Sequence, residues 1–228
     1  YAEDKEITKK VMIEYKQYLM KSEKYKESSI NSFLAAANNF LQFMGWKDAV
    51  VKQYKIQKEV FCSENKVLTK EEYKELVKTA EKQGKRQLSM ILQTIAATGI
   101  RISELQYVTK RAVQKECLEI RNKGKSRKIP IPTKLKVALE RYMKEQEIQE
   151  GMVFVTSGGK PVDRSNIWRD MKKISVQAGI EEEKVFPHNL RHLFAQGFYE
   201  LEKDIAKLAD ILGHSRIETT RIYIMTTS

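Results

Sequence analysis

The sequence predicts a mainly α-helical protein that contains one small antiparallel β-hairpin. Apolar residues recur at helical spacing through most of the 228 residues. The alternation that is typical of strands is concentrated near residues 117–132, where a turn-rich stretch divides it in two. From Ser165 onward, Gly179, Pro187 and Gly213 divide the chain into successive helices. Together these observations favour the mainly α class with a hairpin.

The composition favours a globular protein with a polyanionic partner. Hydrophobic residues make up 41% of the chain, which permits a packed core, and no apolar run approaches the roughly 20 residues of a membrane span. A net charge of +12 favours nucleic acid, although a solvated basic surface is the alternative. Two cysteines, Cys62 and Cys117, cannot build a disulfide framework or a four-thiolate zinc site, which favours a reducing, cytoplasmic setting.

Residues 1–61 are predicted to form a helical domain, and the polar, unpatterned residues 62–66 a linker. The first helix is expected to bury Ile7, Val11, Tyr15, Tyr18 and Leu19. A second helix, capped by Ser28 or Ser29 and ending at Gly45, is expected to bury an apolar face made of Ile30, Phe33, Leu34, Ala37, Phe40, Leu41 and Met44. Two helices rarely bury a sufficient core, so this domain is expected to belong to a larger unit.

Residues 67–228 are predicted to form the second domain. Thr69 and Glu72 have the spacing of a capping box, and the next helix is expected over residues 87–98, ending at Gly99. Two strands are expected at 117–120 and 128–132, and a short third strand at 152–155. A helix is expected to start at Thr133 and to bury Leu135, Leu139, Tyr142 and Met143.

Two basic stretches of this domain are candidates for phosphate chemistry. Arg101 directly follows a helix that ends in glycine, so its guanidinium could be held rigidly toward a phosphate; the alternative is a buried Arg paired with Glu104. Residues 121–128 hold five basic residues on a hairpin tip, from which a lysine could enter a nucleic-acid groove and donate a proton. The alternative is a solvated run of charge.

Two further stretches contain all three histidines. His188 and Arg191 are three residues apart at a helix start and so project to one side. Residues 212–223 contain His214 and Tyr223; the alternative is a helix-turn-helix that reads a DNA groove, with Tyr223 in the core. Arginines, histidines, a lysine and a tyrosine can together transfer a phosphodiester without a metal, because fixed cationic donors stabilise the charge that builds on the phosphate oxygens.

Cofactor sites are not indicated by the sequence. Residues 181–183 are three consecutive glutamates that point in different directions on a helix, which is typical of a solvated acidic patch. The chain also lacks a phosphate-binding loop of the GxxxxGK[ST] type. We therefore expect no cofactor, no metal and no use of ATP.

In their order, these stretches resemble the motifs of the tyrosine recombinase (phage integrase) family, which includes integrases of mobile elements and Xer-like recombinases. TGIRISEL, HNLRH and LGHSRIETTRIY are similar to its first arginine box, its HxxR box and its final His-to-Tyr box. The resemblance implies that Arg101 and Arg191 bind the scissile phosphate and that His214 donates a hydrogen bond to it. Tyr223 would attack to leave a 3′-phosphotyrosine and His188 would assist its proton transfer.

The resemblance also implies that Lys123 protonates the leaving 5′-oxygen, with Lys125 as the alternative because the hairpin is about one residue shorter than usual. It implies a two-domain clamp around double-stranded DNA, with an N-terminally truncated helical arm over residues 1–61. Family members usually act as four protomers on two DNA sites, through a Holliday junction. Further DNA contacts are expected from Lys125, Arg127, Arg169 and Lys172.

Two other functions are also compatible with the sequence. A type IB topoisomerase has a similar catalytic set and would relax supercoiled DNA without a specific site. A non-catalytic regulator built on the helix-turn-helix-like segment would bind duplex DNA tightly and form no covalent product.

Overall fold

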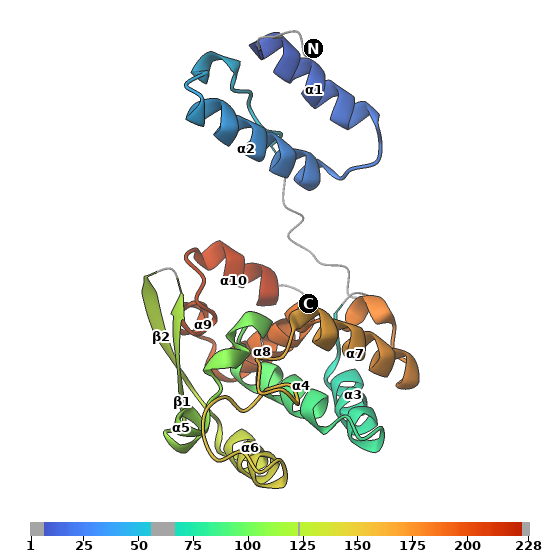
Figure 1. The fold of residues 1–228 in the computed structure, drawn as a ribbon, viewed down its shortest axis with the longest axis vertical. Helices are drawn as coiled ribbons and strands as arrows, with labels where there is room; N and C mark the ends of the chain where they lie inside the picture. Colours follow the sequence, from blue (N-terminus) through green and yellow to red (C-terminus); the bar gives the residue numbers. More distant parts are fainter. Residues whose placement is uncertain (1–6, 56–66, 123, 225–228) are drawn as a thin grey trace. The chain divides into compact units, whose positions relative to one another are not determined.

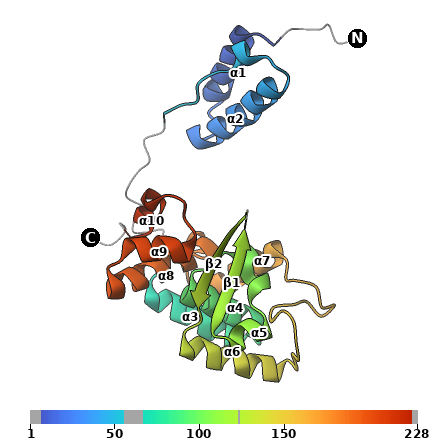
Figure 2. The same ribbon diagram turned by 90° about the vertical axis from the view of Figure 1, so that its left-hand side faces the viewer.

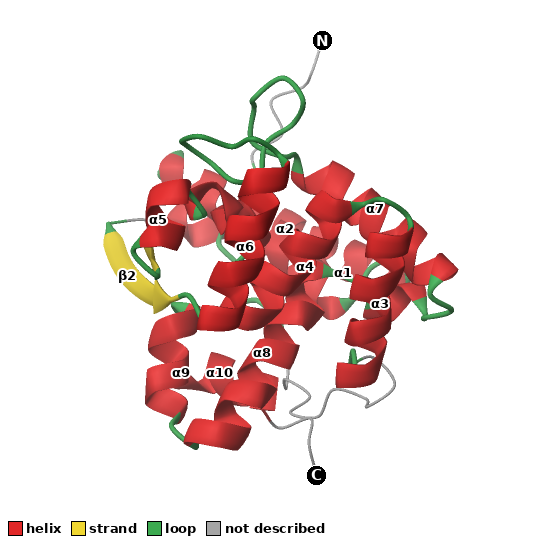
Figure 3. Ribbon diagram, turned by 90° about the horizontal axis from the view of Figure 1, so that it is seen from below, coloured by secondary structure: helices red, strands yellow, loops and turns green. Residues whose placement is uncertain are grey.

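The structure, a computed structural model, describes residues 7–55, 67–122 and 124–224. The chain divides into two compact units, Tyr1–Glu59 and Val60–Ser228 (Figure 1). Among the described helices, none is both long enough and apolar enough to span a membrane. Helices are the dominant element, as the colouring in Figure 3 shows, so the predicted class is confirmed.

Over its described residues, 7–55, the first unit consists of two helices and a short 3-10 helix. Their bounds are α1 (Lys9–Lys21), α2 (Glu27–Phe43) and the 3-10 helix Lys47–Ala49. The small core of this unit contains Met12, Leu19, Ile30, Leu34, Leu41, Ala49 and Val51. Asn38 connects α2 to the segment after the 3-10 helix through two hydrogen bonds. Its side-chain amide donates one to the Val51 carbonyl and accepts one from the Val51 N–H.

Several predictions for this unit are wrong. In α1 the buried positions are Met12 and Leu19, whereas Val11, Tyr15 and Tyr18 are exposed. Apolar residues occur on more than one side of this helix, so spacing alone could not identify its inner face. Helix α2 starts at Glu27, ahead of the expected serine caps, and the exposed residues of its predicted apolar face are Phe33, Phe40 and Met44.

The second unit holds the hairpin and most of the helices. The element bounds are α3 (Lys70–Lys82), α4 (Arg86–Thr98), α5 (Lys110–Gln114), β1 (Cys117–Asn122), β2 (Lys125–Pro130), α6 (Thr133–Glu145), α7 (Arg164–Gln177), α8 (Pro187–Glu202), α9 (Ile205–Leu212) and α10 (Ile217–Ile224). Two further 3-10 helices span Ile102–Tyr107 and Glu182–Lys184. Strands β1 and β2 pair antiparallel, with Asn122 opposite Lys125 (Figure 2).

Helix α4 is the centre of the second unit. Leu88, Ile91, Leu92 and Ile95 are all buried, and α3, α6, α7 and α8 each pack against this helix. The expected capping box at the start of α3 is confirmed: Glu72 N–H donates to Thr69 Oγ1 at 3.1 Å, and Thr69 N–H donates to Glu72 Oε2 at 2.8 Å. The predicted inner face of α6 is also confirmed.

Two predictions for the second unit need correction. Residues 152–155 do not form a strand; they contribute only the isolated bridges Thr109–Met152 and Val155–Pro161. The chain also breaks between α8 and α9 at Lys203, which adopts a positive φ of 53° that no glycine or proline signals in the sequence. Helices α8, α9 and α10 then pack on one another around Ala195, Leu208, Leu212 and Tyr223 (Figures 1 and 3).

Candidate active site

The turn after α4 positions Arg101. Gly99 ends the helix with φ +65°, and a Cβ at this position would lie 2.4 Å from Cδ1 of Phe194, so both the conformation and the packing require glycine. Glu104 accepts hydrogen bonds from the Arg101 N–H at 2.7 Å and from Arg101 Nη1 at 3.1 Å. Arg101 Nη2 also donates to the Gly213 carbonyl at 3.4 Å. The guanidinium is thereby fixed, yet its side chain is 36% exposed and can reach a ligand.

Arg191 lies beside this turn and is almost fully buried, at 3% exposure. Its guanidinium donates to the Gly99 carbonyl and to the Leu212 carbonyl, the latter at 3.2 Å. Burial, together with the positive charge of Arg101, lowers the pKa of Arg191 to about 10, so it remains charged at neutral pH. Because both arginines bind carbonyls of the Gly99 and Gly213 regions, two positive charges lie at one end of α4.

His188 contacts the hydroxyl of Tyr223. Pro187 occupies the first turn of α8, where the missing N–H is tolerated, and His188 follows it. The Tyr223 Oη lies 2.8 Å from His188 Nε2. Burial, and then the charges of Arg191 and Arg101, lower the pKa of His188, so its imidazole is neutral near pH 7 and can accept a proton. Tyr223 is 4% exposed.

His214 lies in the turn between α9 and α10. Together with Arg101, Arg191, His188 and Tyr223 it forms one cluster of side chains. Its Nδ1 lies 2.9 Å from Thr220 Oγ1, and its Nε2 lies 3.5 Å from Arg191 Nη2. Its ring centroid is 5.1 Å from that of Tyr223. Burial, followed by the charges of Arg191 and Arg101, lowers the pKa of His214 to about 4, so this ring is neutral as well.

His192 is a member of the cluster that the sequence analysis missed. Its ring stacks on Tyr223, with centroids 3.9 Å apart and planes 20° apart. Burial, then the electrostatic interaction with His188, lowers its pKa to about 4, and within the described part of the protein its Nδ1 has no hydrogen-bond partner. The available signal was its position four residues after His188, one turn further along the same face of α8.

The predicted basic residues do not all join this cluster. Lys123 lies outside the described residues, and Lys125 lies in β2 opposite Asn122. Arg127 contacts Glu104 and the Ile211 carbonyl. On α7, Arg169 is exposed, and the Lys172 ammonium donates to the Glu182 carbonyl.

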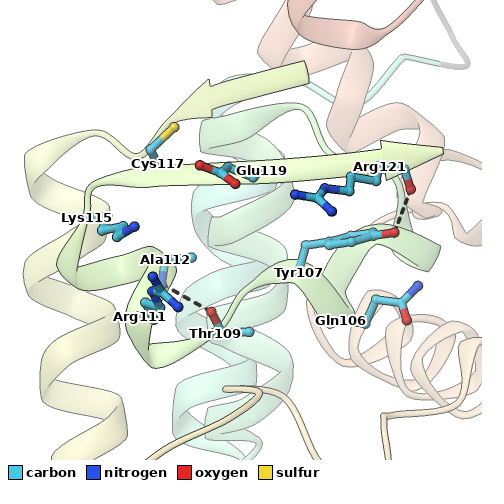
Figure 4. Close-up of a pocket in the computed structure, with 9 residues that line it drawn as sticks. All are labelled: Gln106, Tyr107, Thr109, Arg111, Ala112, Lys115, Cys117, Glu119 and Arg121. Atoms are coloured by element: carbon cyan, nitrogen blue, oxygen red, sulfur yellow. Dashed lines mark hydrogen bonds between the residues drawn. The ribbon is translucent and has the colours of Figure 1, made fainter. Parts of the chain in front are cut away.

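A separate pocket of about 380 Å³ lies between α5 and β1, and none of the five predicted catalytic residues that the structure describes lines it (Figure 4). Tyr107 closes one side of it and donates a hydrogen bond from its hydroxyl to the Arg121 carbonyl at 2.6 Å. Arg111, Lys115 and Arg121 line it together with Glu119, so the pocket is basic on balance. Among the described residues, no group of three or more His, Cys, Asp or Glu could hold a metal ion.

Comparison with known proteins identifies the class. Residues 66–228 match the model of the phage integrase family, which is most of the chain. Tyrosine recombinase XerA of Pyrococcus furiosus is 31% identical over 218 residues, which cover 92% of this chain and 73% of that protein. This chain therefore belongs to the phage integrase family and is an enzyme of the tyrosine recombinase type.

Other relatives match a smaller share of their own length. Tyrosine recombinase XerD of Chlamydia trachomatis is 37% identical over 142 residues, which cover 58% of this chain and 46% of that protein. The crystal structure of XerH site-specific recombinase bound to its difH substrate has a TM-score of 0.73 and 18% identity, covering 96% of this chain and 67% of that one. A lambda integrase tetramer bound to a Holliday junction also has a TM-score of 0.73, with 17% identity, covering 97% and 65%. At these identities the two structures establish the shared fold alone.

Proposed function

We propose that this protein is a site-specific DNA recombinase or integrase that cuts and rejoins DNA strands through a 3′-phosphotyrosine at Tyr223. The observation that carries the proposal is the 2.8 Å contact between Tyr223 Oη and His188 Nε2, within the cluster that also contains Arg191 and His214. A tyrosine that served only the core would not need its hydroxyl to face a neutral imidazole beside two guanidinium groups. The contact therefore supports the catalytic role over the helix-turn-helix alternative.

The proposed step transfers one phosphoryl ester bond. The Tyr223 oxygen attacks the scissile phosphorus and its phenolic proton passes to His188, which is neutral and so able to accept it. The bond between phosphorus and the 5′-oxygen breaks, and that oxygen takes up a proton from Lys123, or from Lys125 as the alternative. The products are a 3′-phosphotyrosine and a free 5′-hydroxyl. Attack by a 5′-hydroxyl reverses every transfer, so rejoining consumes no ATP.

The cluster offers three groups to the charge that builds on the phosphate oxygens. Arg101 and Arg191 supply permanent positive charges on donors that the protein has already oriented. His214 is neutral; when the Thr220 hydroxyl donates to its Nδ1, the Nε2 carries the proton and can donate to the phosphate. Arg191 is deeply buried, so its positive charge is weakly screened by water. It therefore offsets part of the desolvation free energy of the phosphate in the site.

The proposal includes the assembly. Double-stranded DNA would be the partner, residues 1–61 would form a helical arm and residues 62–66 a linker to the catalytic domain at 67–228. Four protomers would act on two sites through a Holliday junction; the structure of a lambda integrase tetramer bound to a Holliday junction supports this part of the proposal. A net charge of +12 supports a DNA partner, and the low cysteine content supports a reducing, cytoplasmic setting for the proposed activity.

The experiment uses a duplex selected from a random-sequence library by its affinity for the protein, with a nick placed 3′ of each position in turn. The short fragment diffuses away after cleavage, so a covalent adduct accumulates and migrates slowly in a denaturing gel. We expect the adduct with the unaltered protein and none with Tyr223→Phe. Strand exchange between two selected sites supports the recombinase. Relaxation of a supercoiled plasmid that lacks the site, without exchange, would favour the topoisomerase; tight binding without an adduct would favour the regulator.

A further inference from the structure

Arg127 connects the β-hairpin to the cluster. It lies in β2, 15% of its side chain is exposed, and its Nη2 donates to Glu104 Oε2 at 2.7 Å. Its Nε donates to the Ile211 carbonyl near the end of α9 at 2.9 Å. One guanidinium therefore joins three segments that are far apart in the sequence: the hairpin, the 3-10 helix after Arg101 and the end of α9.

Glu104 is the acceptor that Arg127 shares with Arg101. The carboxylate is 3% exposed and binds the Arg101 N–H, the Arg101 guanidinium and the Arg127 guanidinium. Burial alone would raise the pKa of Glu104, but the hydrogen bonds from Arg127 and the Arg101 N–H outweigh it and lower the pKa. A charged Glu104 therefore holds both arginines in fixed positions.

The same guanidinium packs against Gly213. A Cβ at Gly213 would lie 2.8 Å from Arg127 Nη1 and 3.0 Å from its Cζ, so an alanine at this position would displace the guanidinium. Gly213 also has φ +66° and accepts a hydrogen bond from Arg101 through its carbonyl. Arg127 and Arg101 thus contact the residue that immediately precedes His214.

We propose that Arg127 is a positioning residue, which orients Arg101 and the turn that holds His214 and links both to the hairpin whose strands flank position 123. This inference rests on the proposed function. It replaces the DNA contact expected for Arg127, because its donors are directed to Glu104 and Ile211. The chemical consequence is that the hairpin and the phosphate-binding groups are held in one geometry, and errors of about 1 Å in such geometry can lower a rate by about 100-fold.

The test compares Arg127→Ala and Arg127→Lys with Lys128→Ala, a matched control that removes a positive charge from the exposed neighbouring position of the same strand. We measure single-turnover adduct formation at saturating concentrations of the selected nicked duplex, and DNA affinity over a range of salt. Arg127→Ala is expected to lower the rate about 100-fold. Its DNA affinity should stay within about twofold, with an unchanged salt slope. Arg127→Lys should recover little, because a lysine cannot bind Glu104 and Ile211 together.

Added guanidinium ion gives a readout that loss of folding would not produce. It should restore part of the rate of Arg127→Ala, because the ion can occupy the space beside Glu104, and it should not accelerate Lys128→Ala. If Arg127→Ala fails to fold, Gly213→Ala is the second test. As a single substitution it should slow adduct formation, and the double variant with Arg127→Lys should be little slower than Gly213→Ala alone.

Three results would overturn the inference. The first is an unchanged rate for Arg127→Ala at saturating DNA. The second is a salt slope that falls by about 0.9, the value for one lost phosphate contact. The third is a double variant, Gly213→Ala with Arg127→Lys, whose rate of adduct formation falls by the full product of the two single effects. The proposed function is tested apart from this, by whether the unaltered protein forms an adduct that requires Tyr223.

Discussion

Replacing Gly99 with alanine is expected to destabilise the second unit because the new methyl group has no space. The added Cβ would lie 2.4 and 2.7 Å from two atoms of the Phe194 ring and 3.0 Å from Leu212 Cδ2. The left-handed conformation of Gly99 costs an alanine roughly 1–2 kcal/mol. Overpacking of a core contact adds about 1–3 kcal/mol. The free energy of unfolding should therefore fall by about 2–5 kcal/mol in total.

Gly84 provides a matched control in the same unit. It has a similar φ of +69°, but a Cβ there would meet nothing within 4 Å, so Gly84→Ala tests the conformational cost alone. Urea unfolding of both variants, followed by circular dichroism, measures the difference. Phe194→Leu in the Gly99→Ala background should recover at least about 1 kcal/mol, since it shortens the obstructing side chain. Equal destabilisation of the Gly84 and Gly99 variants would refute the packing argument.

Three further predictions concern the histidines and Arg191. First, His192 has a pKa of about 4 in the folded protein against 6.5 when unperturbed, so protonation favours the unfolded chain. The associated stability is present above pH 6.5 and is lost as the pH falls toward 4; His192→Phe should remove about 3 kcal/mol of that acid-dependent loss, as measured by urea unfolding at several pH values. An unchanged pH dependence would contradict the burial of a neutral imidazole. Second, Thr220→Val should slow adduct formation about tenfold, because it removes one hydrogen bond that orients His214; an unchanged rate would show that Thr220 does not orient the ring. Third, Arg191→Lys should slow adduct formation by about 10²–10³ while leaving DNA affinity within a few-fold, since a lysine cannot hold the Gly99 and Leu212 carbonyls and face the phosphate together. A parallel loss of affinity and rate would instead indicate a ground-state contact.

The parts of the fold that could be predicted from the sequence are those with local causes. The capping box at Thr69 needs only its own four residues, and Gly99 and Gly213 end helices in a conformation that glycine adopts freely. The inner face of α6 followed from a clean helical period. The buried face of α1 could not be predicted in this way. Its own apolar residues lie on more than one side of the helix, and packing against the rest of the first unit decides which of them are buried.

The candidate site shows the same division. The pairing of Arg101 with Glu104 spans three residues, so the sequence analysis could offer it as an alternative, and the structure contains it together with an exposed guanidinium. The contact of Arg127 with the same carboxylate spans 23 residues and depends on the packing of the hairpin against α9. The stacking of His192 on Tyr223 likewise requires α10 to pack against α8. Long-range contacts of this kind carry no periodic signal.

The predicted strand at residues 152–155 is wrong for a related reason. A short apolar run is compatible with a buried strand or with any buried segment. Val153 and Phe154 are indeed buried, at 0% and 1% exposure, but the segment forms only isolated bridges, to Thr109 and Pro161. Burial was predictable from the apolar side chains, whereas hydrogen-bond pairing was not.

The most direct measurement is to identify the amino acid that becomes attached to DNA. The protein is incubated with the selected nicked duplex, digested with protease and nuclease, and the peptide that carries a residual nucleotide is sequenced by mass spectrometry. The proposed mechanism predicts a single modified peptide, with the phosphodiester on Tyr223. A nucleotide on any other residue, or efficient strand exchange with no modified peptide at all, would contradict it.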